Sequence, residues 1–113
     1  MVAKSPLLSA PPYQVEQNLK VLGANLRTAR LRRNLTAEEV GEKIGVHRHI
    51  VSDAERGKPS TTIAVYAALL WAYGLTEQLS LVADPETDDE GLALERARAP
   101  QRSRQGTSLD DNF

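Results

Sequence analysis

The 113-residue chain lacks cysteine, has only 4% aromatic residues and contains no apolar run near the roughly 20 residues that a membrane span needs. Without cysteine, neither disulfides nor thiolate metal sites can support the fold. The N-terminus also lacks the apolar stretch of a secretory signal. We therefore expect a cytoplasmic chain with one compact domain and polar tails.

Residue sets that carry catalysis are missing as well. No Ser-His-Asp or Cys-His set can be assembled, no glycine loop could cradle a phosphate, and the adjacent Glu38 and Glu39 lie in a capping turn. His47 and His49, two residues apart, diverge on a helix, and no cysteine or third histidine exists to complete a metal site. The sequence predicts no enzyme, no cofactor and no metal centre.

Charge is divided unevenly along the chain, although the formal net charge is only -1. Residues 20–58 carry nine Lys/Arg against five Asp/Glu, whereas residues 84–95 carry six acidic residues and no basic one. The first segment can attract a polyanion, and the second would be repelled by one. An ordinary solvated surface would explain the same charges, so the residue pattern must decide.

The first third of the chain contains an expected arm and an expected helix. Residues 1–13, with Pro6, Pro11 and Pro12, predict a flexible arm that forms no helix. In residues 14–33 apolar side chains recur mostly at three- and four-residue spacing, which predicts a helix that is ended by Asn34. Its expected buried face consists of Leu19, Leu22, Leu26, Ala29 and Leu31.

Two short helices are expected next. Thr36 and Glu39 form a capping box that starts a helix at Ala37, and Gly45 ends this helix after about two turns. Residues 46–56 separate on a helical wheel into an apolar and a polar side. The apolar side has Val46, Ile50, Val51 and Ala54, and the polar side has His47, Arg48, His49, Ser52 and Asp53.

The remaining signals complete an all-α architecture. Ser60, Thr61 or Thr62 can cap a fourth helix that runs to Tyr73, with both Tyr66 and Tyr73 in the core, and the apolar residues of 75–82 predict a short fifth helix. Residues 14–83 are therefore expected to form a compact four-to-five-helix domain, with a helix-turn-helix at about residues 36–56. Residues 84–113 are expected to form an acidic, mixed-charge tail with at most a short helix near 92–98.

Several short sequence pieces follow one another with a characteristic spacing. They are Leu26-Arg-x-x-Arg30, Leu35-Thr-x-Glu-Glu-Val40, Ile44-Gly-Val46, Val51-Ser52 and Glu55-Arg-Gly-Lys-Pro59. Together they resemble the lambda-repressor/Cro-like (XRE) helix-turn-helix family over residues 22–75. The resemblance implies a lambda-repressor-like fold and a homodimer that binds a palindromic operator in double-stranded DNA. It also implies transcriptional repression in the bacterial cytoplasm, at the nucleoid when bound.

A second resemblance is softer. Residues 57–62, together with Ala-Leu-Leu-Trp71, are similar to HipB-like antitoxins, the partners of HipA-type kinases. This resemblance implies an antitoxin that represses its own operon and neutralises a HipA-type toxin. The alternative is a free-standing phage- or chromosome-type regulator that has no toxin partner.

Separately, the acidic residues of 84–95 and the scattered apolar and basic residues after them predict that residues 84–113 contact a protein partner. The alternatives for this segment are a solubilising tail and a basic arm that reaches along DNA through Arg102 and Arg104.

The expected DNA-reading residues lie on the polar side of residues 46–56. Arg48, near the start of an inserted helix, can bond guanine O6 and N7 together, with His49 and Ser52 as companions. Asp53 could accept a hydrogen bond from a cytosine amine or be paired within the chain. Contacts to the DNA backbone are expected from Thr36, Ala37, His47, Lys58, Ser60 and Thr61. Arg32 and Arg33 are either helpers of these contacts or ordinary solvated charges.

The family resemblance also implies structural roles. Arg30 and Glu55 match an internal ion pair that fastens the first family helix to the end of the third. Gly41, where the family usually has Ala, would mark close packing of two helices, and Ala37 stands where the family often has a DNA-bonding Gln. The expected dimer or partner surface consists of Trp71, Leu75, Leu79 and Val82.

Overall fold

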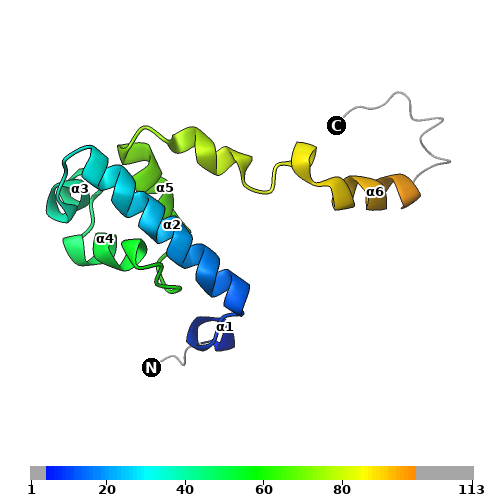
Figure 1. Ribbon diagram of the computed structural model, residues 1–113, viewed down its shortest axis with the longest axis horizontal. Helices are drawn as coiled ribbons and strands as arrows, with labels where there is room; N and C mark the ends of the chain where they lie inside the picture. Colours follow the sequence, from blue (N-terminus) through cyan, green and yellow to red (C-terminus); the bar gives the residue numbers. More distant parts are fainter. Residues whose placement is uncertain (1–4, 99–113) are drawn as a thin grey trace. The chain divides into compact units, whose positions relative to one another are not determined.

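The computed structural model describes residues 5–98, which form helices and turns with no strand in that range (Figure 1). The helices are α1 (Pro6–Ser9), α2 (Tyr13–Arg32), α3 (Ala37–Ile44), α4 (Arg48–Glu55), α5 (Ile63–Ala72) and α6 (Asp89–Arg98), with 3-10 turns η1 (Thr76–Leu81) and η2 (Pro85–Thr87). The described part of the chain divides into two compact units, of which the first ends at Leu79 and the second begins at Ser80. The all-α prediction is confirmed.

The first unit has one apolar core between α2, α3, α4 and α5. Both α2 and α3 pack on α4, and α5 contacts α3 and α4. The largest fully buried side chains there are those of Leu26, Val40, Val51 and Leu69. Tyr66 and Tyr73 are also buried in this core, so the prediction for these two aromatic residues is confirmed. The hydrophobic faces of the eight-residue helices α3 and α4 are thus covered by their neighbours, which stabilises helices that would be marginal in isolation.

Local signals set the ends of α2 and α3. After α2, Asn34 adopts a left-handed conformation (φ 59°), which an asparagine tolerates better than most residues. The Thr36 hydroxyl accepts a hydrogen bond from the Glu39 N–H (3.0 Å), and a Glu39 carboxylate oxygen accepts one from the Thr36 N–H (2.8 Å). Gly45 then ends α3 with φ 84°. The predicted capping box and glycine stop are both confirmed.

Gly23 and Gly41 allow backbones to approach each other closely. A Cβ atom at Gly41 would lie 2.5 Å from the Val46 carbonyl oxygen, in the turn before α4. A Cβ atom at Gly23 would lie 2.5 Å from the Glu55 carbonyl oxygen, at the end of α4. Because no side chain fits at these distances, glycine at both positions sets how α2 and α3 sit on α4.

Two expectations about the N-terminal part were wrong. Residues 6–9 form the single turn α1, in which Pro6 occupies a first-turn position and the Ser5 hydroxyl accepts from the Leu8 N–H (3.3 Å). Proline is accepted there because the first helical N–H groups have no intrahelical partner. Leu31 is 49% exposed, because it lies five residues after Leu26 and therefore about 140° away around the helix. Residues 1–4 of the predicted arm lie outside the described residues.

The segment after α5 differs from the predicted fifth helix. It forms the 3-10 turn η1, and Leu75 and Leu79 pack against the core of the first unit, whereas Val82 is exposed. In the second unit, the expected short helix is present as α6, none of whose residues is buried. Residues 99–113 of the predicted tail lie outside the described residues. Within residues 5–98, no helix is long and apolar enough to cross a membrane.

Candidate nucleic-acid interface

The N-terminus of α4 presents three polar side chains to solvent. His47 is the N-cap of this helix, and its Nδ1 atom accepts a hydrogen bond from the His49 N–H (3.0 Å). An imidazole that accepts through Nδ1 can still donate through Nε2. Arg48 and His49 follow as exposed residues of the first turn. The sequence placed His47 on the helix itself, whereas it stands just before it.

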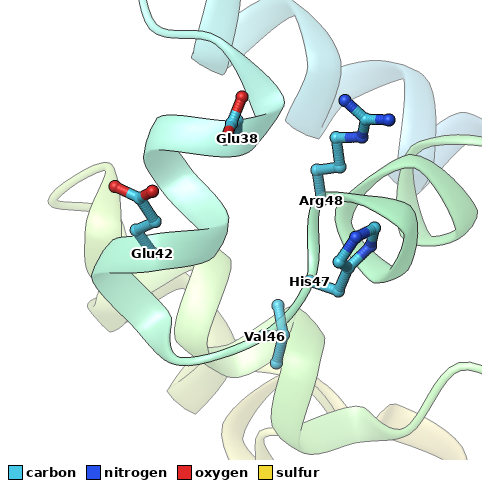
Figure 2. Close-up of a pocket in the computed structure, with 5 residues that line it drawn as sticks. All are labelled: Glu38, Glu42, Val46, His47 and Arg48. Atoms are coloured by element: carbon cyan, nitrogen blue, oxygen red, sulfur yellow. The ribbon is translucent and has the colours of Figure 1, made fainter.

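A groove separates the start of α4 from α3. Figure 2 shows Glu38 and Glu42 projecting from α3, with Val46, His47 and Arg48 on the other side. Neither carboxylate forms an ion pair with a cation within residues 5–98. Arg48 also has no ion-pair partner in this part of the chain, so its guanidinium is free to meet a ligand. The uncompensated charge of Glu38 and Glu42 disfavours phosphates on the α3 side of the groove.

Asp53 does not point outward as its position on the helical wheel predicts. Its side chain is only 11% exposed and pairs with Arg56 and Lys58, with 3.5 Å between Oδ2 of Asp53 and Nζ of Lys58. Of the two alternatives, pairing within the chain agrees with this geometry and reading a cytosine amine does not. The Asp53 side chain is covered because the side chains of Arg56 and Lys58 contact its carboxylate. Ser52, one residue earlier, is half-buried.

The N-terminus of α3 suits a phosphate less well than the sequence suggests. The capping box occupies the N–H of Thr36 and one acceptor site of its hydroxyl, which leaves the hydroxyl proton and the N–H groups of Ala37 and Glu38. The helix dipole favours an anion there. However, the carboxylates of Glu38 and Glu39 lie in the same first turn, and their negative charge opposes a phosphate.

The loop between α4 and α5 carries the other expected backbone contacts. Lys58 and Ser60 are exposed, whereas the Thr61 hydroxyl oxygen is buried. The expected contact through the Thr61 amide is corrected, because this N–H already donates to the Lys58 carbonyl (3.0 Å). Thr62, the N-cap of α5, is exposed and makes no side-chain cap bond. The Thr62 hydroxyl and the first N–H groups of α5 are therefore available to bind a phosphate. The sequence alone indicates Thr62 only as one of three possible N-caps.

Arg30 and Glu55 form the ion pair that the family resemblance implies. The Arg30 Nε and Nη2 atoms donate to the two carboxylate oxygens of Glu55 (2.7 and 2.9 Å), and Nη1 donates to the Leu35 carbonyl (2.9 Å). The hydrogen bond to Glu55 raises the pKa of Arg30, although burial lowers it. The guanidinium thus joins α2 to the end of α4 and to the residue before the α3 cap.

Of the two arginines at the end of α2, Arg33 makes contacts within the chain and Arg32 is a solvated surface residue. Arg33 donates to the Ala29 carbonyl (2.9 Å), and its guanidinium lies 5.6 Å from the centre of the Tyr73 ring. Arg32 lies nine residues after Gly23, hence about 180° around α2 from the side that meets α4. It is exposed and lines a shallow groove with Asn25, Thr28 and Gln78. We therefore place neither arginine in the interface.

The expected dimer or partner surface is only partly exposed. Trp71 is 58% exposed, and the Lys43 ammonium lies 5.7 Å from its ring centre. Val82 is exposed as well. Leu75 and Leu79 instead pack on the core of their own unit, so their assignment to an outer surface is corrected.

A family model described as a helix-turn-helix domain matches residues 21–81, more than half of the chain. The chain belongs to this helix-turn-helix family. No curated protein and no solved structure matches it. Within the helix-turn-helix domain, α3 and α4 are the two helices joined at Gly45, and α4 occupies the place of the helix that enters the major groove. The family indicates a DNA-binding regulator and does not single out HipB-like antitoxins among its members.

Proposed function

We propose that the protein is a transcriptional repressor that binds a palindromic operator in double-stranded DNA as a homodimer, in the bacterial cytoplasm. One observation carries this proposal: the first turn of α4, in the position of a recognition helix, presents Arg48 and His49 unpaired and exposed. Arg48 is assigned to a guanine, which a guanidinium recognises through O6 and N7. His49 and the half-buried Ser52 read the adjacent base edges.

Backbone contacts come from both ends of α4 and from the start of α3. His47 donates from Nε2 to a phosphate beside the N-terminus of α4, and Lys58 and Ser60 contact a phosphate beyond its C-terminus. At α3, Thr36 and Ala37 make a weaker contact, because Glu38 and Glu39 oppose the phosphate charge. These contacts fix the register of α4 in the groove and carry no base specificity.

A dimer is proposed because one recognition helix of eight residues reads too few bases to select a single site in a genome. Two-fold symmetry would place the two α4 helices about one helical turn of DNA apart, near 34 Å, on an inverted repeat. Exposed apolar side chains suitable for association are Trp71 and Val82. Trp71 lies in the first unit and Val82 in the second, and we assign each of them separately to the dimer or to a protein partner.

A second candidate is the antitoxin function, in which the same chain also occupies a HipA-type toxin. It is favoured by α6, a helix without a single buried residue. Isolated helices of this length are marginal in water, so a protein that covers Leu94 and its neighbours would stabilise it. Co-expression with the product of the adjacent reading frame, followed by purification through a tag on that product, tests this candidate.

The proposed function is tested by selecting bound sequences from random duplexes with the full chain. Footprinting of the selected duplex and light scattering of the complex then give the site and the stoichiometry. We expect an inverted repeat bound by two chains. Selection without any sequence enrichment would contradict sequence-specific repression, and a footprint of one half-site at saturation would contradict the dimer.

A further inference from the structure

Three charged side chains converge at the C-terminal end of α4. The Asp53 carboxylate pairs through Oδ1 with Arg56, one turn later, and through Oδ2 with the Lys58 ammonium at 3.5 Å. The Asp53 side chain is 11% exposed, whereas those of Arg56 and Lys58 are 64% and 53% exposed. One nearly buried anion therefore holds two cations whose remaining surface faces solvent.

The backbone of the same loop is tied to Asp53 as well. The Asp53 carbonyl oxygen accepts from the N–H groups of Arg56 (3.2 Å) and Lys58 (3.1 Å). Between them, Gly57 has φ 72°, and a Cβ atom there would lie 2.6 Å from the Leu19 carbonyl oxygen of α2. The loop is thus held by hydrogen bonds on one side and by α2 on the other, so both cations start from fixed backbone positions.

Arg56 and Lys58 each keep free hydrogen-bond donors after pairing with Asp53. The guanidinium of Arg56 has five N–H donors in a planar fork, and one nitrogen faces Asp53. An ammonium has three donors, of which one suffices for a carboxylate oxygen. A long side chain that is already held by an ion pair loses less conformational entropy when it binds a ligand. The cluster can therefore present donors to a second anion without first being ordered by it.

We propose that Asp53 is a positioning residue that holds Arg56 and Lys58 as a clamp for phosphates of one DNA strand, and that Arg56 is a further phosphate-contacting residue. The proposal rests on the proposed DNA binding and assigns a role to a carboxylate that would otherwise only repel the backbone. Glu42 provides the contrast, since it is an exposed carboxylate on α3 beside the start of α4. Glu42 has no cation partner in the described part of the chain, so its charge repels phosphate and holds no lysine or arginine side chain in position.

The test measures dissociation constants of full-length variants over a series of salt concentrations. Two duplexes are used, the one selected by the wild-type chain and a scrambled version of it. Asp53→Asn should weaken binding to both duplexes by the same factor, about threefold to tenfold. Arg56→Ala and Lys58→Ala should each lower the slope of log K against log salt by about one. In the Asp53→Asn and Lys58→Ala double variant, the combined loss should be smaller than the product of the single losses.

Two control variants match these changes. Glu42→Gln removes the same charge as Asp53→Asn and should tighten binding to both duplexes, because it only relieves repulsion. Arg32→Ala removes a cation from the opposite side of α2 and should leave the salt slope unchanged. Melting temperatures of all variants show whether each one folds.

The outcomes separate the proposal from its rivals. A loss confined to the selected duplex in Asp53→Asn would make Asp53 a base reader and overturn the proposal. Tighter binding to both duplexes, as in Glu42→Gln, would reduce Asp53 to a repelling charge and overturn it as well. Should Asp53→Asn not fold, Arg56→Ala decides, and an unchanged slope there overturns the clamp. If the wild-type chain binds neither duplex, the proposed function itself has failed.

Discussion

Arg30 and Glu55 lie 25 residues apart in the sequence and meet through two hydrogen bonds of 2.7 and 2.9 Å. Both side chains are nearly buried, and a third bond from Arg30 reaches the Leu35 carbonyl. The pair therefore connects the scaffold helix α2 with the two helices of the helix-turn-helix. The orientation of the proposed recognition helix depends on a contact that lies away from the DNA-facing side chains.

We expect Arg30→Ala to destabilise the fold by about 3–5 kcal/mol, because Glu55 would be left charged, buried and unpaired. Urea unfolding of the variant and of Arg32→Ala, which removes an exposed arginine two residues later, measures the difference. DNA affinity should fall only as far as the folded fraction falls. Equal midpoints for the two variants would show that the pair contributes little to stability.

A second prediction concerns Tyr73 at alkaline pH. Burial raises the pKa of Tyr73 to about 12, and the Glu55 carboxylate adds to this shift. A tyrosine in the unfolded chain has a pKa of about 10. The unfolded chain therefore loses this proton first, so the stability linked to Tyr73 is fully present below pH about 10 and declines as the pH rises toward about 12.

Comparison with Tyr73→Phe isolates this effect. The Tyr73 hydroxyl is buried without a hydrogen-bond partner among the described residues, so its removal should cost little at neutral pH. At high pH the variant should become more stable than the wild-type chain, by at most about 3 kcal/mol. Tyr13→Phe, at an exposed position, serves as the control and should follow the wild-type curve. Parallel curves for wild type and Tyr73→Phe would contradict the shift.

The third prediction separates base reading from backbone contact. Arg48→Ala should cost about 1–3 kcal/mol on the selected operator and less on random DNA, because it removes a bidentate bond to one base. Lys58→Ala should weaken binding to both and flatten the salt dependence. Fluorescence anisotropy with both duplexes measures this. An equal loss on both duplexes for Arg48→Ala would remove Arg48 from the base-reading role.

The fourth prediction concerns the segment after Ala83. A chain that ends at Ala83 contains the whole helix-turn-helix match and lacks the acidic residues of 84–95, which phosphates repel. We expect it to bind the operator like the full chain and to lose a protein partner that the full chain retains. Loss of operator affinity by a shortened chain that is still folded and dimeric would contradict this expectation.

Much of the fold was predictable because its signals are local. Thr36, Glu39 and Gly45 fix the ends of α3 through their own side-chain and backbone chemistry, which acts wherever these residues occur at this spacing. The prediction that residues 1–13 form no helix was wrong because the effect of proline depends on its position. Inside a helix, proline removes a backbone hydrogen bond, whereas in the first turn, where Pro6 lies, no such bond is lost.

The site was less predictable because it depends on how the chain folds after each helix ends. A helical wheel assigns Asp53 to the exposed polar side, whereas its side chain is only 11% exposed, because the wheel contains no information about the residues that follow the helix. Lys58 returns to this carboxylate after Gly57, which takes a positive φ next to α2, whereas Arg56 reaches it from the C-cap of α4, three residues after Asp53. Leu75 and Leu79 were assigned outward for a similar reason, since the sequence alone does not show how the segment after Gly74 folds back on the core.

The contact between Gly57 and the Leu19 carbonyl has a consequence for where the working domain begins. The family match starts at residue 21, yet the backbone that buttresses the loop after α4 comes from the residues just before it. The second turn of α2, which contains Leu19, thus supports the loop at Gly57, almost forty residues later in the sequence. A chain that begins at residue 21 lacks the Leu19 carbonyl that lies against Gly57. We therefore expect substitutions near Leu19 to change the position of Lys58, and with it the proposed phosphate contact, without changing Lys58 itself.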